Sequence, residues 1–158
     1  MRFALLADYP ESIPQIASWY FDQWGYLHPD TGLEDMESKL RGSLNRYELP
    51  LLILAFENDE LVGVAQLKFH EMDIYPDKEH WLGGVYVPVE HRGQGIAAKV
   101  IRHALRIART LGIPTLFLQT EELGGGLYSN LGWVPVAQAR NCGLDVLVME
   151  KVLDEKIV

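Results

Sequence analysis

The chain has little cysteine, few basic residues and no long apolar run. Cys142 is its single cysteine, so an internal disulfide is excluded. The longest apolar run, residues 49–56, is far too short to cross a bilayer. Against 22 Asp and Glu there are only 14 Lys and Arg, and the net charge of −8 argues against a nucleic-acid partner. We therefore expect a globular protein that binds neither nucleic acid nor membrane.

The first residues do not resemble a secretory signal. Their apolar stretch is short, and Asp8 and Glu11 follow it at once. Together with the single cysteine, this predicts a reducing, cytoplasmic location.

Hydrophobic periodicity predicts one α/β domain over residues 1–158, with a mixed sheet. The expected strands are 2–7, 51–56, 61–70, 81–87, 114–119, 133–139 and 144–151. The expected helices are one that starts between Pro10 and Pro14 and stops at Gly25, then 33–47, 95–111 and 126–131. This gives the order β-α-α-β-β-β-α-β-α-β-β. The strand, helix and strand at 81–119 predict a parallel crossover.

A glycine-containing loop before the longest predicted helix is the most informative segment. Gly93 and Gly95 allow a sharp turn and the close approach of a ligand. The free N–H groups and the dipole of the following helix favour an anion such as a diphosphate. Basic residues follow on one helix face, namely Lys99, Arg102, Arg106 and Arg109. A turn without a ligand, followed by a merely solvated helix face, is the alternative.

Two familiar phosphate-binding patterns do not fit this loop. No Gly-Lys-Ser/Thr sequence follows the glycines, so the loop is not a Walker loop. Ala98 stands where the dinucleotide fingerprint requires a third glycine.

The loop instead resembles a signature of the GNAT acyltransferase superfamily. Arg92-x-x-Gly95-x-Ala97 is similar to that family's Arg/Gln-x-x-Gly-x-Gly/Ala, and the segment 84–88 resembles its fourth strand. The segment 127–133 resembles its second signature, a tyrosine followed four residues later by glycine and an aromatic residue. Because both signatures occur in the right order and the strand order agrees, the chain is identified as a member with the acyl-CoA N-acyltransferase fold.

The resemblance implies that acetyl-CoA is the acyl donor, with no metal. In such enzymes the loop amides bind the diphosphate, and the fourth strand binds the pantetheine arm where it splays from the fifth. The implied coenzyme A-binding residues are Val85, Tyr86, Val87, Arg92, Gly93, Gln94, Gly95, Ile96, Ala97, Ala98, Lys99 and Tyr128.

The resemblance also implies a general acid and leaves the general base open. Tyr128 matches the tyrosine that protonates the leaving thiolate, with a purely packing role as the alternative. The strand glutamate of many relatives falls near Trp81, which cannot act as a base. Glu79 and His80, adjacent to it, are the candidates. The alternatives are His70, Glu71, Asp73 and a water relay. The asparagine that many relatives carry before the last helix is missing from residues 120–123.

The acceptor is expected against the first two helices, residues 19–47. This region is aromatic and acidic, which suits a cationic amine, although core packing and solvation explain such residues as well. Its relevant members are Trp19, Tyr20, Trp24, Tyr26, His28, Asp22, Asp30, Glu34, Asp35 and Glu37.

Together these features predict an acetyl-CoA-dependent N-acetyltransferase. It would move an acetyl group to a primary amine of a small molecule or peptide by direct attack in a ternary complex. A non-catalytic acyl-CoA sensor of the same fold and a different nucleotide binder are the alternatives. The sequence leaves a homodimer open.

Overall fold

The computed structural model describes residues 1–153 of the 158-residue chain. Its strands are β1 (Arg2–Leu5), β2 (Leu51–Glu57), β3 (Glu60–Phe69), β4 (His80–Tyr86), β5 (Thr115–Thr120), β6 (Val134–Asn141) and β7 (Leu144–Val152). Its helices are α1 (Ile13–Trp24), α2 (Leu33–Arg41), α3 (Ile96–Thr110) and α4 (Gly126–Asn130). Short 3₁₀ turns are η1 (Leu6–Asp8), η2 (Pro10–Ser12), η3 (Gly25–Leu27) and η4 (Val89–His91).

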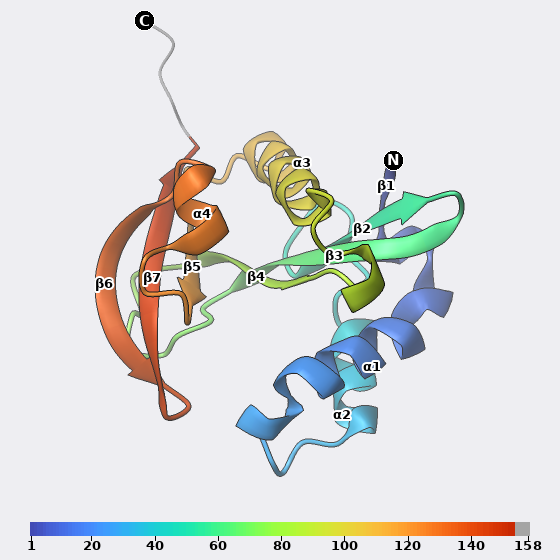
Figure 1. Cartoon of the computed structure of the whole chain (residues 1–158), viewed down its shortest axis with the longest axis horizontal. Coiled ribbons are helices and arrows are strands. Elements are labelled where there is room, and N and C mark those ends of the chain that lie inside the picture. The colour runs from blue at the N-terminus through green and yellow to red at the C-terminus, as the bar shows by residue number, and fades with distance from the viewer. Residues whose placement is uncertain (154–158) are drawn as a thin grey trace, which may run out of the picture.

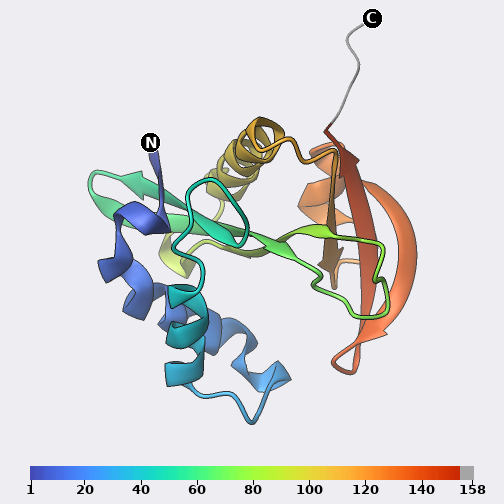
Figure 2. The same ribbon diagram turned by 180° about the vertical axis from the view of Figure 1, so that it is seen from behind.

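Within the described residues, the strands form one sheet in the order β1-β2-β3-β4-β5-β7-β6. The neighbours β4 and β5 run parallel, and each other neighbouring pair is antiparallel. The helices α1 and α2 cover one face of this sheet, while α3 and α4 lie on the other (Figures 1 and 2). The predicted mixed sheet and the parallel crossover through α3 are confirmed.

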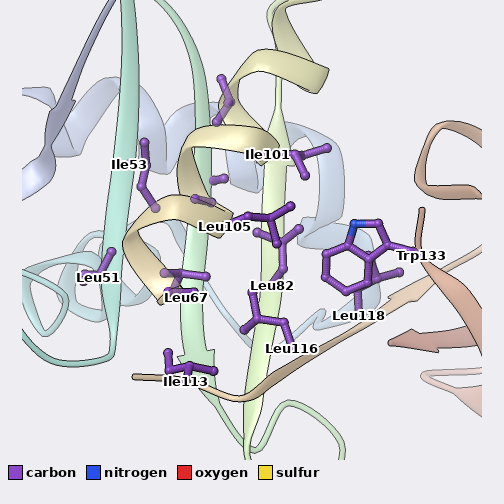
Figure 3. Close-up of a cluster of buried hydrophobic side chains, with 14 of the residues drawn as sticks. Leu51, Ile53, Leu67, Leu82, Ile101, Leu105, Ile113, Leu116, Leu118 and Trp133 are labelled. Atoms are coloured by element: carbon purple, nitrogen blue, oxygen red, sulfur yellow. The ribbon is translucent and has the colours of Figure 1, made fainter. Parts of the chain in front are cut away.

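The larger core lies between the sheet and α3. Apolar residues recur along α3 every three or four positions, so one face of the helix is buried. Ile101 and Leu105 of this face pack near Leu67 and Leu82 of the central strands (Figure 3). Trp133 joins them and is 2% exposed, so it is a core residue.

A second core lies between the sheet and α1. Ile13, Ile16 and Ala17 are buried there against Leu52 and Leu54 of β2. Residues that alternate along β2 thus supply both cores, which explains why the strand is apolar throughout.

Two predicted boundaries were wrong. The second helix was expected to reach residue 47, but α2 ends at Arg41. The helix does not continue past Gly42, whose N–H donates hydrogen bonds to carbonyls of the last helical turn. Leu44 forms a β-bridge with Leu51 instead. The apolar spacing had continued through Leu44, although a glycine is a common end for a helix. The first strand also stops early, at Leu5, and gives way to η1.

The parallel strands β4 and β5 separate almost as soon as they meet. Their only register pair in the described chain is Trp81 with Phe117, whereas β5 pairs with β7 along its whole length. The opening implied by the family resemblance is therefore present between the C-terminal halves of these two strands.

Candidate functional site

A cavity of about 630 Å³ lies where β4 and β5 diverge. Its walls come from α1, η3 and α2 on one side, and from β5, α4 and the β6–β7 turn on the other. The charged or polar residues that line it include Tyr20, Gln23, His28, Lys39, Gln66, Lys68, Glu71, Gln119, Thr120, Glu121, Glu122, Tyr128 and Asn141. Elements far apart in the sequence therefore place ionisable groups around one space.

A second cavity of about 240 Å³ leads from this space toward the glycine loop. Val85 and Trp24 line both cavities, and Arg92 and Ala97 line only the smaller one. The smaller cavity is lined by three predicted coenzyme A-binding residues at the end of β4 and just after it, namely Val85, Tyr86 and Val87. The two cavities thus follow the C-terminal half of β4 from the loop to the strand opening.

The glycine loop has the backbone geometry that an anion site needs. Gly93 has φ of 81° and Gly95 has φ of 78°, both in the left-handed region that favours glycine. A Cβ atom at either position would meet no heavy atom within 4 Å, so the space beside the loop is open. Gly95 is the N-cap of α3, and the first backbone N–H groups after it have no partner inside the helix.

Arg92 folds back onto the end of β4. Its Nε donates a hydrogen bond to the Val87 carbonyl over 2.8 Å, and its guanidinium lies 5.5 Å from the centre of the Tyr86 ring. Tyr86 in turn stacks on Trp19 of α1, with ring centres 5.2 Å apart. These contacts attach the loop to the strand and to the first helix.

Tyr128 reaches the larger cavity from α4. Its ring packs against the core and meets the buried Trp133 edge to face, at 6.2 Å between centroids. Burial raises the pKa of the Tyr128 phenol, and the nearby carboxylate of Glu71 raises it further. The phenol therefore keeps its proton at neutral pH and has a proton to donate.

Glu71 faces the same cavity from the loop that joins β3 to β4. One of its carboxylate oxygens lies 2.5 Å from Lys68 Nζ, and the other is buried with no hydrogen-bond partner in the described chain. A Cβ atom on Gly83 would lie 2.9 Å from Glu71 Oε1, so the carboxylate rests directly over β4. A buried carboxylate oxygen without a donor is suited to accept a proton or an ammonium group.

Glu79 and His80 lie elsewhere. They are at the start of β4, where His80 Nε2 is 3.7 Å from Glu79 Oε1, and they are not among the residues that line either cavity. His80 is four residues before Gly84, which corresponds to roughly 13 Å along a strand. Of the base candidates named from the sequence, the structure brings Glu71 to Tyr128.

Sequence reasoning missed several lining residues. Asn141, the last residue of β6, donates a hydrogen bond to Gln119 Oε1 over 2.8 Å, and both line the larger cavity. An asparagine thus reaches the site from β6, although residues 120–123, before α4, contain none. Lys68 and Gln66 were also missed. The sequence does not show which face of β3 would meet the opening between β4 and β5.

One group of possible metal ligands lies outside the site. Glu60, Glu90 and His91 can place a ligand atom each within 4.8 Å of one another. The two glutamates are exposed, and none of the three residues lines a cavity. This group therefore has no part in the candidate site. Among the described helices, none has the length and hydropathy to cross a membrane.

Residues 13–133 match the acetyltransferase (GNAT) family. No curated protein matches the sequence.

Solved structures share the fold over the whole chain. An aminoglycoside 6′-acetyltransferase of type Ii has 18% identity and a TM-score of 0.76, over 99% of this chain and 100% of that one. An aminoglycoside 6′-N-acetyltransferase in complex with coenzyme A has 15% identity and a TM-score of 0.77, over 100% of both chains. The aminoglycoside 6′-N-acetyltransferase from Enterococcus faecium has 15% identity and a TM-score of 0.73, again over 100% of both. The expected fold is therefore confirmed.

Proposed function

The chain belongs to the acetyltransferase (GNAT) family, and we propose that it transfers the acetyl group of acetyl-CoA to the primary amine of a small cationic molecule. The observation that carries this proposal is a pair of neighbouring cavities that share Val85: the smaller is lined by Arg92 and Ala97 of the loop segment, and the larger by Tyr128 and Glu71.

The donor half of the proposal rests on the loop and on β4. The backbone N–H groups from Gly93 to Ala98 would bind the diphosphate, with open space beside Gly93 and Gly95, and Arg92 and Lys99 add positive charge. The Val85 carbonyl and main-chain groups of Val87 would bind the pantetheine arm as an added strand, because β5 has moved away from this half of β4. The thioester would then lie in the larger cavity.

The chemical step would use Glu71 as the base and Tyr128 as the acid. Glu71 takes one proton from the bound ammonium, and the amine nitrogen forms a bond to the acetyl carbonyl carbon. The carbon–sulfur bond breaks, and Tyr128 gives its phenol proton to the departing thiolate. The second proton that the nitrogen loses replaces the one given up by Tyr128. The products are an N-acetyl amide, coenzyme A with a free thiol, and one proton released to solvent.

The acceptor half of the proposal rests on the lining of the larger cavity. Three glutamates and two lysines line it, and Glu71 is already paired with Lys68. Aromatic rings of Tyr20 and Trp24 lie on the same wall, where they suit an ammonium group. Two of the structural neighbours are aminoglycoside 6′-acetyltransferases, which supports a small-molecule amine as the acceptor.

Two measurements test this function. Calorimetric titration with coenzyme A, ATP and NAD should show tight binding of coenzyme A alone. Thiol release from acetyl-CoA should then depend on an added amine, in a panel of an aminoglycoside, a linear polyamine and a peptide with a free N-terminus. If coenzyme A does not bind, the whole proposal is wrong. If it binds tightly and no amine is acetylated, the chain is an acyl-CoA sensor instead.

A further inference from the structure

A buried phenol on α1 contacts the backbone of β4 at its most irregular point. Tyr20 is 4% exposed, and its O–H donates a hydrogen bond to the Gly84 carbonyl over 2.7 Å. This residue lies on the wall of the larger cavity, and the proposed chemical step gives it no role.

The carbonyl that Tyr20 binds belongs to a β-bulge. Gln66 pairs with Gly83 and Val64 pairs with Tyr86, so two residues of β4 oppose one residue of β3. Gly84 is the first residue of this bulge and has φ of 54°, in the left-handed region. The peptide between Gly84 and Val85 is therefore turned out of the regular ladder.

Side chains from two elements are fitted to this bulge. A Cβ atom on Gly84 would lie 2.6 Å from Tyr20 Oη and 2.7 Å from Gln66 Oε1. Only glycine leaves room for the phenol to reach the carbonyl. Tyr20 is itself held by Trp24, whose ring centre lies 5.3 Å away.

We propose that Tyr20 is a positioning residue that fixes the 84–85 peptide so that the Val85 N–H donates a hydrogen bond to the thioester carbonyl of acetyl-CoA. The C=O and N–H of a trans peptide point in opposite directions, so holding the Gly84 oxygen toward α1 turns the Val85 N–H away from α1. Val85 lines both cavities, at the point where the donor would pass from one to the other.

Such a donor would act where negative charge develops during the reaction. The thioester oxygen becomes more negative as the amine attacks the carbonyl carbon, and a fixed N–H stabilises that charge without reorganising. Burial raises the pKa of the Tyr20 phenol, so the phenol stays a hydrogen-bond donor throughout the range in which the enzyme would work. This inference rests on the proposed function, because it needs a bound acyl thioester.

The direct test is Tyr20→Phe, with Tyr9→Phe as the matched control. Tyr9 packs against the same core, and its phenol accepts a hydrogen bond from Arg2 outside both cavities. Removing an oxyanion donor costs about 10²–10³ in kcat, and Tyr20 acts on its donor indirectly, so we expect a loss of roughly 10- to 100-fold. The affinity for coenzyme A should stay within about twofold, since free coenzyme A has no thioester carbonyl. Tyr9→Phe should leave turnover and affinity unchanged.

A spectroscopic signal separates positioning from a merely structural role. Acetyl-CoA labelled with ¹³C at the acetyl carbonyl should show a downfield shift of that carbon when it binds the wild-type protein without an amine. In Tyr20→Phe the shift should return toward the value of free acetyl-CoA. Gly84→Ala, which forces the same peptide to move while keeping the phenol, should show the same loss of shift and turnover, and it provides a second route if Tyr20→Phe folds poorly.

Wild-type turnover and an unchanged carbonyl shift in Tyr20→Phe would overturn the inference. An equal loss of affinity for coenzyme A and acetyl-CoA would also overturn it, because the Val85 N–H would then serve a pantetheine amide. Both results leave the proposed function intact, whereas a wild-type protein that binds no acetyl-CoA would refute that function first.

Discussion

Replacing Gly95 by tryptophan gives the sharpest test of the donor site. A Cβ atom at Gly95 meets no protein atom within 4 Å, so the indole would extend into the open space beside the loop. In the proposed function that space holds the diphosphate. We expect the affinity for coenzyme A to fall at least 100-fold, which corresponds to about 2.8 kcal/mol of binding free energy.

The substitution also strains the backbone, and this cost must be separated from the loss of the ligand. Gly95 has φ of 78°, and a residue with a side chain in that region costs roughly 1–2 kcal/mol. For a chain of this size, the melting temperature would fall by about 2–4 °C per kcal/mol.

Gly112 provides the matched control at the other end of the same helix. It has the same φ of 78° and equally open surroundings. Gly112→Trp should therefore lower the melting temperature about as much as Gly95→Trp while it keeps wild-type affinity for coenzyme A. Calorimetric titration and thermal melting of both variants measure the two effects. Near-normal affinity in Gly95→Trp, or an equal loss in Gly112→Trp, would refute the loop assignment.

Three further predictions concern the reacting groups. Tyr128→Phe should lower kcat by about 10²-fold while the Kd of coenzyme A barely changes, and calorimetry with steady-state kinetics checks both. Glu71→Gln should lower kcat by about 10²–10⁴-fold near neutral pH. This deficit in kcat should shrink as pH approaches the pKa of a free primary amine, about 10. A deficit that stays constant with pH would exclude Glu71 as the base, and Glu79→Gln is the control variant. Folding raises the pKa of the Tyr128 phenol above its ordinary value of 10.0. The free energy of unfolding should therefore fall as pH rises above about 10, and it should fall less steeply in Tyr128→Phe. Chemical denaturation at several alkaline pH values measures this free energy.

The sequence predicted the elements well wherever a local signal marked their ends. The two-residue turn at Asn58 and Asp59, with φ of 51° and 65°, appears in the sequence as a polar break between two apolar strands. Gly95 similarly marks the start of α3. The end of α2 was missed because the apolar period continued through Leu44, and only the tertiary structure shows that Leu44 pairs with β2 instead.

The proposed donor site could be inferred from the sequence because it is local, whereas the choice of Glu71 as the proposed base needed tertiary contacts. The loop from Arg92 to Ala97 is one continuous segment with its own glycine pattern. Glu71, in contrast, reaches the cavity because the chain turns at His70, with φ of 44°, and because Gly83 leaves space on the neighbouring strand. Neither spacing nor residue type indicates that the two meet. The two base candidates favoured from the sequence lie away from the opening, since His80 is the first residue of β4 and Glu79 precedes it.

The proximity of Glu71 and Tyr128 links the two proton transfers in the proposed reaction. The charge on Glu71 raises the pKa of the Tyr128 phenol and so holds the acid in reserve while the amine is still protonated. Once Glu71 has taken the ammonium proton, its charge is gone and the phenol becomes a stronger acid, at the stage when the thiolate needs a proton. A glutamine at position 71 is neutral throughout, so it should leave Tyr128 permanently in this more acidic condition. The loss in Glu71→Gln must then come from deprotonation of the amine alone, which is why a supply of free amine at high pH should restore it.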